Sequence, residues 1–145
     1  MKRILSFAML VLLLLTLCAC GGDVSTVKIS AVPSERFTES EINDAIQVIV
    51  AAFETSWSGC TLTEIAYAGD DINARETEYY LEQHYTDFSA VWGEYDRLII
   101  LTSSFDVDQS GGDGSLNPNS TYTDWSWILV KSGDGPWRYV DHGYG

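Results

Sequence analysis

Oxygen-bearing side chains with metal-ligand spacing follow the short apolar run at residues 98–101. Asp106, Asp108 and Ser110 occupy alternate positions in segment 106–111, which matches the first half of an oxygen-rich calcium loop. The match then fails, because position twelve is Asn117 instead of a bidentate Glu, and a strand instead of a helix is expected before the loop. Two interpretations stay open: an incomplete site for millimolar extracellular calcium, or a solvated connection that needs no metal.

Aromatic side chains form the second group with chemical potential, and they gather in the last quarter of the chain. Trp125 and Trp127 share one face of an alternating segment, and pairing with Trp137 or Tyr139 on the next strand would build an aromatic ladder. The rings either form core against a helix or present a partly exposed platform for a small molecule, a glycan or a peptide. Because both faces of this segment carry apolar residues, a single helix cannot cover them, and a second covering element is required.

The clearest element that could position these groups is an amphipathic helix over residues 39–57. Thr38 as N-cap and Glu41 three residues later predict a capping box, and Phe37 is placed to pack against Ile42. Apolar residues then recur at helical spacing until segment 58–59 ends the helix. They are Ile42, Ala45, Ile46, Ile49, Phe53 and Trp57. This stripe is wide enough to lie across a sheet and form one wall of the core.

Alternating and continuous apolar runs predict the strands of that sheet. The expected strands cover residues 60–67, 97–105, 121–131 and 137–141, with the second of them buried on both faces. A minor second helix begins near residues 73–76 and carries Tyr80, Leu81, His84 and Tyr85, and residues 26–32 form a candidate edge strand. The predicted fold class is α+β, in which an amino-terminal helix packs on a curved antiparallel sheet of about four strands.

Composition fits one acidic globular domain. The 145 residues are 46% apolar, and 8 basic against 21 acidic side chains give a formal net charge of −13. Apolar content at this level supports a folded core. The scarcity of Lys and Arg argues against nucleic acid as a partner, because phosphate neutralisation supplies most of that affinity.

The amino terminus predicts export. Residues 1–3 form a cationic head, and the mostly apolar run 4–17 spans roughly 21 Å as a helix, short of the ~30 Å that a transmembrane helix must cross. Segment 17–20, ending in Ala19 and Cys20, resembles the lipobox of bacterial lipoproteins, in which a small residue precedes the cysteine that becomes lipidated. This resemblance implies a signal peptide over residues 1–19, a lipidated cysteine with a short tether over 20–28, and one α+β domain over 29–145.

The lipid anchor has consequences for location and for the remaining thiol. Fatty-acyl chains on Cys20 would hold the protein on the extracytoplasmic face of the cell membrane. Cys60 is then left without a disulfide partner. Neither His84 nor His142 stands in a pattern typical of thiol enzymes, so we expect Cys60 to be a small buried apolar residue and not a nucleophile.

Four segments resemble blocks of a family of uncharacterised lipoproteins from Gram-positive bacteria: residues 37–42, 59–64, 117–125 and 137–144. The order of elements resembles the cone-shaped α+β fold of the nuclear-transport-factor-2-like superfamily, also described as a cystatin-like cone. In that fold an amino-terminal helix packs into the concave face of a curved sheet. The resemblance implies fold and location, no cofactor, and no assigned activity.

Relatives of the cone fold often hold small ligands inside the cone, and some perform acid-base chemistry there with Asp, His or Tyr. The resemblance makes Asp124, Asp141 and His142 the weak catalytic candidates. We favour a membrane-anchored module that binds a small molecule, a glycan or a protein at the cell envelope without catalysis. A small cone-fold enzyme and a calcium-stabilised structural module are the alternatives.

Overall fold

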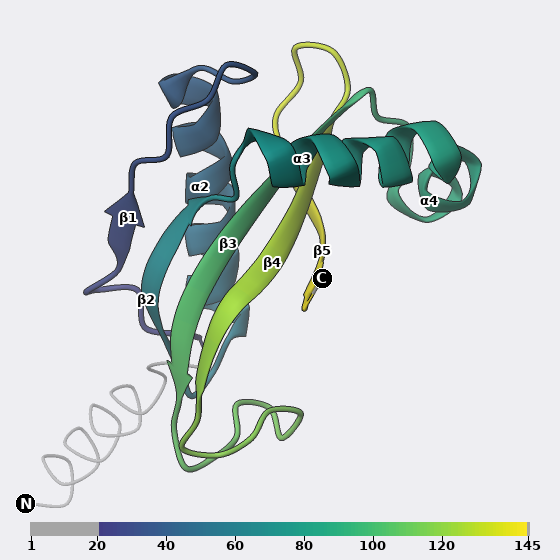
Figure 1. Cartoon of the computed structure of the whole chain (residues 1–145). Helices are drawn as coiled ribbons and strands as arrows, with labels where there is room; N and C mark the ends of the chain where they lie inside the picture. The colour runs from purple at the N-terminus through teal and green to yellow at the C-terminus, as the bar shows by residue number, and fades with distance from the viewer. Residues whose placement is uncertain (1–20, 145) are drawn as a thin grey trace, which may run out of the picture.

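A five-stranded mixed sheet forms the centre of the protein (Figure 1). The computed structural model describes residues 21–144, so the predicted signal peptide and Cys20 lie outside the described residues. The strands are β1 (Lys28–Ser30), β2 (Cys60–Tyr67), β3 (Arg97–Val107), β4 (Thr121–Lys131) and β5 (Arg138–Gly143). They neighbour one another in chain order. The α+β class is therefore confirmed, whereas the expected count of about four strands is too low.

The first strand accounts for the difference in strand number and direction. β1 lies within the candidate edge segment 26–32 and pairs with β2 in parallel, while the other neighbouring strands are antiparallel. A parallel pair needs a crossover connection, and helix α2 (Glu39–Ser56) supplies it. The prediction of a purely antiparallel sheet is thus wrong at this edge.

Helix α2 begins with the predicted capping box. The Thr38 hydroxyl accepts a hydrogen bond from the Glu41 N–H at 3.2 Å, and the Glu41 carboxylate accepts one from the Thr38 N–H at 3.0 Å. The helix ends at Ser56, one residue earlier than expected, and Trp57 is its C-cap residue. The Trp57 ring still packs on the stripe, where it stacks on Phe53.

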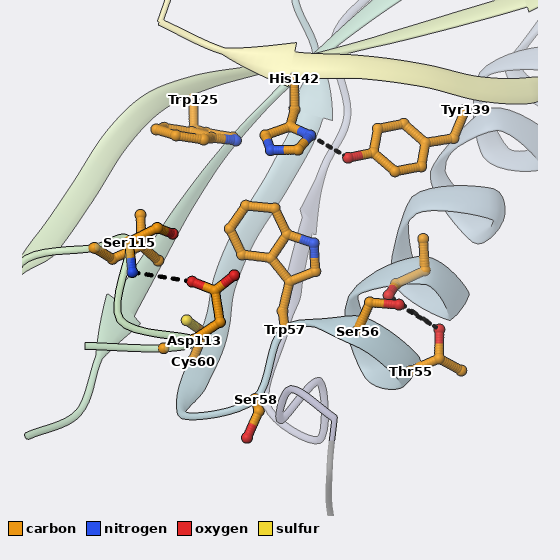
Figure 2. Close-up of a pocket in the computed structure, with 13 residues that line it drawn as sticks. Thr55, Ser56, Trp57, Ser58, Cys60, Asp113, Ser115, Trp125, Tyr139 and His142 are labelled. Atoms are coloured by element: carbon orange, nitrogen blue, oxygen red, sulfur yellow. Dashed lines mark hydrogen bonds between the residues drawn. The ribbon is translucent and has the colours of Figure 1, made fainter. Parts of the chain in front are cut away.

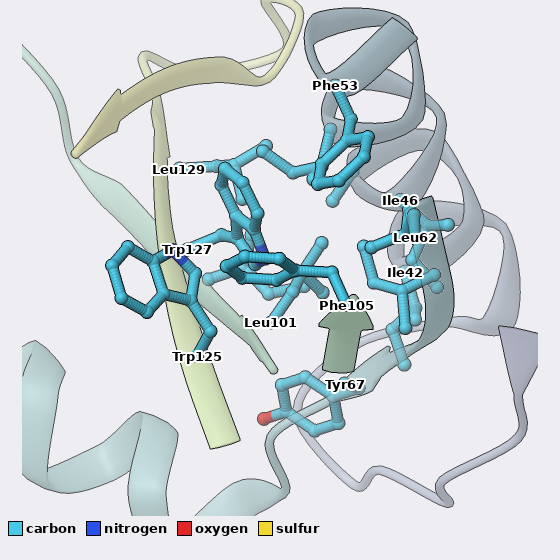
Figure 3. Packing of buried hydrophobic residues seen from close by; sticks show 14 of the residues in the cluster. Ile42, Ile46, Phe53, Leu62, Tyr67, Leu101, Phe105, Trp125, Trp127 and Leu129 are labelled. Carbon is cyan, nitrogen blue, oxygen red and sulfur yellow. The ribbon is translucent and has the colours of Figure 1, made fainter. Parts of the chain in front are cut away.

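The main core lies between α2 and one face of the sheet, here called the inner face (Figure 3). The buried residues of the helix are those of the predicted stripe: Ile42, Ala45, Ile46, Ile49 and Phe53. Trp127 is fully buried beneath them, and its indole N–H donates to the Ser103 hydroxyl at 2.8 Å. Its one polar atom is therefore satisfied inside the core.

A second helical layer covers the opposite, outer face of the sheet. It consists of α3 (Asp70–Thr77), the π-helical segment η1 (Glu78–Gln83) and α4 (Tyr85–Trp92), and Figure 1 shows it crossing the sheet. The single minor helix of the sequence prediction is therefore replaced by two α-helices with a π-helical turn between them. Tyr80, Leu81, Tyr85, Phe88 and Trp92 pack on a second buried cluster of β3 and β4. This layer is the second cover that the apolar faces of β4 required.

The chain before β1 is docked on the domain. The Gly22 N–H donates to the Phe53 carbonyl at 3.0 Å, and Asp23 forms a parallel bridge with Thr61. The Asp23 N–H donates to the Cys60 carbonyl at 2.8 Å, and the Asp23 carbonyl accepts from the Leu62 N–H at 2.8 Å. The start of segment 21–28, expected as a tether, thus lies along α2 and β2. Among residues 21–144, no helix combines the length and apolar character needed to cross a bilayer.

Candidate functional site

A cavity of about 480 Å³ opens where the inner-face core ends, beyond the last turn of α2 (Figure 2). We call it the open-end cavity. One wall is the end of α2 with its C-cap, the second is the loop that joins β3 to β4, and the third is the inner face of β4 and β5. Its lining includes four rings, those of Trp57, Trp125, Tyr139 and His142.

These rings come from three elements and contact one another in T-shaped, stacked and tilted pairs. Trp57 stacks on Phe53 with ring centroids 5.3 Å apart, which anchors it to the core. Its ring then meets Trp125 at 6.0 Å and His142 at 5.1 Å, both in T-shaped geometry. Because the contacts are of the kinds that aromatic pairs prefer, the rings support one another around the cavity without filling it.

The imidazole of His142 is held in a defined setting. Its Nδ1 forms a hydrogen bond with the Tyr139 hydroxyl, shown as a dashed line in Figure 2. Partial burial lowers the pKa of His142, and the nearby Asp141 carboxylate opposes part of that shift. His142 is therefore neutral at pH 7. Burial, assisted by Asp141, raises the pKa of Tyr139 to about 12, so its hydroxyl keeps its proton.

Trp125 carries an unused hydrogen-bond donor beside the cavity. Within residues 21–144, its Nε1 is the one buried side-chain nitrogen or oxygen without a hydrogen-bond partner. Leaving such a group unsatisfied costs roughly 1–3 kcal/mol. Figure 2 shows the nitrogen end of the indole directed toward His142. The wall of the cavity therefore contains one indole N–H that no described residue uses.

The charge of the cavity is negative. Asp113 lies in the wall and accepts a hydrogen bond from the Ser115 N–H at 3.0 Å, and this turn lowers its pKa. The hydroxyls of Thr55, Ser56 and Ser58 add neutral donors and acceptors. No Lys or Arg appears among the described residues that line the cavity.

Cys60 also reaches the cavity, but its thiol is not activated. The residue is 4% exposed, as predicted for a small buried apolar residue. Burial, followed by the carboxylates of Asp108 and Asp113, raises the pKa of the thiol to about 11. The thiol is therefore protonated at neutral pH and is a poor nucleophile.

The four aromatic residues predicted to bind ligand separate into three locations. Trp125 and Tyr139 line the open-end cavity. Trp127 is sealed in the core at 0% exposure. Trp137 is buried near the first turn of α2, where its indole N–H donates to the Glu41 carbonyl at 3.2 Å. The last two are therefore structural residues.

The three weak catalytic candidates do not meet in one cavity. Asp124, whose φ of 56° places it in the left-handed region, lines a shallow depression with Glu64 and Ser104. Asp141 lines a cavity of about 180 Å³ that Arg75 of α3 also borders. His142 borders this cavity as well as the open-end cavity. Asp124 therefore shares neither site with the other two.

The calcium-like segment also lacks a shared centre. β3 continues to Val107, so Asp106 stays in the strand ladder, where its carboxylate accepts from the Thr121 hydroxyl at 2.6 Å. The Asp108 carboxylate instead accepts from the N–H and the hydroxyl of Ser110, at 2.7 and 2.5 Å. In the described part of the chain, no three His, Cys, Asp or Glu side chains are grouped to hold a metal ion.

Trp57 and Asp113 are among the lining residues that sequence reasoning did not assign to a site. The Ser58-Gly59 stop was a usable signal for Trp57, because it places this residue at the end of the helix. Asp113 lies in a polar loop whose composition carries no pattern for its position.

Comparison with known proteins gives no matching family model, no matching curated protein and no matching solved structure. The open-end cavity is therefore the feature that bears on function.

Proposed function

We propose that this protein is a lipid-anchored extracytoplasmic binding protein whose open-end cavity holds a small uncharged ligand of the saccharide class. The observation that carries the proposal is a core left open at one end, with about 480 Å³ bordered by four rings. This volume falls within the ~300–1,000 Å³ range of small-molecule sites. Aromatic walls with a few polar groups are the usual composition of such sites.

The polar groups favour a saccharide over a charged ligand. Ring faces accept the apolar side of a sugar, and Asp113 with the neighbouring hydroxyls can accept and donate hydrogen bonds to its hydroxyl groups. An anionic ligand would be repelled by Asp113. A simple ammonium ligand would suit the rings and the carboxylate, but it has no acceptor for the hydroxyl groups of Thr55, Ser56 and Ser58.

Residues 1–20 support the location. The cationic head, the apolar run and Cys20 after Ala19 resemble a lipoprotein leader. We retain the resemblance to the lipoprotein family and to the nuclear-transport-factor-2-like cone as proposals. The cone implies a helix packed on one face of the sheet, and α2 packs in this way. The separation of Asp124 from His142 favours binding without catalysis.

Titration of the purified protein tests the ligand class. N,N′-diacetylchitobiose is the saccharide probe, and choline and glycerol 3-phosphate are the cationic and anionic probes. We expect the disaccharide to change tryptophan fluorescence saturably and the other two to leave it unchanged. Saturable binding of choline or glycerol 3-phosphate without the disaccharide would contradict the saccharide assignment.

Two variants locate the binding. Trp57→Ala removes a ring of the cavity and should weaken disaccharide binding about tenfold or more, which corresponds to roughly 1.4 kcal/mol. Tyr79→Ala is the matched control, because Tyr79 is an exposed ring on η1 that does not line the cavity. Equal loss in both variants would contradict this site.

Mass spectrometry of the membrane-extracted protein separately tests lipidation at Cys20, where an unmodified thiol would contradict the anchor.

A further inference from the structure

We infer that the end of the domain that carries the open-end cavity faces the membrane, so that a ligand is bound at the bilayer surface. This orientation rests on the proposed lipid anchor at Cys20, and it goes beyond that proposal by assigning a membrane-facing surface. The surface consists of Gly21–Asp23, the last turn of α2 and the loop that follows β3.

The first argument is the docking of the chain directly after the anchor position. Gly22 is hydrogen-bonded to the Phe53 carbonyl, and Asp23 is bridged to β2 between Cys60 and Leu62. One trans peptide unit, about 3.8 Å between Cα atoms, separates residue 20 from Gly21. Acyl chains on Cys20 would therefore leave the protein beside the carboxyl end of α2.

The second argument is the close fit of the two glycines. A Cβ at Gly21 would lie 1.6 Å from the Glu54 carbonyl oxygen, and one at Gly22 would lie 2.5 Å from the Phe53 ring. Both distances are far below a van der Waals contact, so this path along α2 requires glycine at both positions. A flexible spacer would require glycine at neither.

The third argument is the position of the cavity relative to this contact. Thr55, Ser56 and Trp57 line the cavity and follow Phe53 by two to four residues along α2 and its C-cap. A rise of about 1.5 Å per residue places them within roughly 6 Å of the docking contact along the helix axis. The amino end of the helix, at Glu39, precedes Phe53 by 14 residues and therefore lies roughly 21 Å from the docking contact. An anchor at one end of α2 therefore sets that end toward the lipid.

Negative charge on this face prevents it from sealing against the bilayer. Asp23, Glu54, Asp108 and Asp113 belong to the docked segment, the end of α2 and the loop, and each carries an exposed carboxylate. Anionic lipid repels such groups within the ~8 Å screening length at physiological salt. The anchor pulls the face toward the membrane, and the carboxylates preserve a hydrated layer through which a saccharide can reach the cavity.

Depth-dependent quenching in lipid nanodiscs tests the orientation. The full chain is expressed with its leader in the Cys60→Ser background, since Cys60 is the one described cysteine. One variant carries a fluorophore at Ser58→Cys, at the cavity, and the matched variant carries it at Asp134→Cys, near the amino end of α2. Lipids with nitroxide-labelled acyl chains are the quencher. We expect at least threefold stronger quenching at position 58.

A third variant tests the cause of the orientation. Gly22→Leu cannot keep the packing against Phe53, so the segment after residue 20 should detach and the two positions should become equally quenched. Equal quenching in the parent, or an unchanged difference in Gly22→Leu, would overturn the inference.

Mass spectrometry of each sample distinguishes a failure of the membrane orientation from a failure of the proposed function. An unmodified Cys20 overturns the anchor and the orientation together. Disaccharide binding in detergent is read independently and does not depend on orientation.

Discussion

The two ends of α2 carry similar aromatic side chains in opposite electrostatic settings. At the amino end, which we call the closed end, the Arg97 guanidinium lies over the rings of Phe37 and Trp137, at 5.3 and 5.7 Å from their centroids. The Lys131 ammonium lies 4.8 Å from the Trp137 centroid. Glu41 pairs with both cations, at 2.5 Å and 3.6 Å.

At the open end, four rings border the cavity, and no Lys or Arg appears among the described residues that line it. The Trp137 indole N–H is used inside the fold, whereas the Trp125 indole N–H has no partner. A groove of about 520 Å³ also lies beside Trp137, but Lys131 already covers that ring. The comparison teaches that cations occupy the ring faces at the closed end, while the rings that border the open-end cavity are left available to a ligand.

The largest expected effect comes from truncating one tryptophan at each end. Trp137 is 6% exposed and carries two cation contacts, so Trp137→Ala should lower the free energy of unfolding by about 3–5 kcal/mol and the melting temperature by roughly 10 °C or more. Trp57 is only half-buried, so Trp57→Ala should cost about 1–2 kcal/mol. Thermal unfolding followed by circular dichroism measures both. Equal losses at the two ends would break the comparison.

The next largest effect concerns the charge of the Glu41 carboxylate at the closed end. The Thr38 N–H and the Arg97 guanidinium, with a smaller share from the Thr38 hydroxyl, lower the pKa of Glu41 to about 2. Glu41→Gln removes the charge while keeping the shape, and it should cost about 1–2 kcal/mol at pH 7. Denaturant unfolding measures this loss.

The pH dependence of the same variant gives a sharper test. A carboxylate whose pKa is lower in the folded state stabilises the protein fully above its unfolded pKa of ~4.3. That contribution is lost as the pH falls toward about 2. The stability difference between the parent protein and Glu41→Gln should therefore shrink between pH 5 and pH 2. A difference that is constant across this range would show that Glu41 does not act through its charge.

Local signals predicted most of the element bounds. The Thr38 and Glu41 capping box, the stripe of α2 and the alternation of β4 from Trp125 onward were correct, because caps and periodicity are properties of neighbouring residues. Before Trp125 a register shift against β3 breaks the alternation, so that Tyr122 pairs with Phe105. The outer-face layer was only partly predicted. The need for a second cover followed from the apolar faces of β4, but nothing in the sequence distinguished the π-helical turn of η1 from an α-helix.

The cavity could not be predicted in full because a register shift decides its lining. Strict alternation would place Tyr139 and Asp141 on one face of β5 and His142 on the other. A bulge shifts the pairing between Ile128 and Leu129, so that Tyr139 and His142 both reach the inner face. One inserted residue therefore exchanges Asp141 for His142 in the site. Such a bulge depends on pairing across strands and leaves no local pattern.

The thiol at the base of the open end gives a smaller effect. Cys60→Ser should lower the free energy of unfolding by about 1 kcal/mol, because a hydroxyl replaces a buried thiol. In the parent protein, the raised pKa and the 4% exposure should make Cys60 react with Ellman's reagent at pH 8 at least tenfold more slowly than in urea. The double variant Cys18→Ala and Cys20→Ala provides the matched background with this thiol alone. Equal rates in the native and unfolded protein would show that the cavity wall does not bury Cys60.

The smallest expected effect tests whether calcium supplies the open end with the cation that it lacks. Asp106 is held in the strand ladder by Thr121, and Asp108 is engaged by Ser110, so their carboxylates do not converge on one ion. Adding 5 mM calcium, roughly the extracellular range, should therefore shift the melting temperature by less than about 1 °C, and chelator should leave it unchanged. The double variant Asp106→Asn and Asp108→Asn is the control, and it should respond in the same way. A rise of several degrees in the parent that is absent from this control would revive the calcium-stabilised module. It would also give the open end a cationic centre like that of the closed end. The two ends would then differ in the kind of cation that they hold, and the open end would no longer be distinguished as a ligand site.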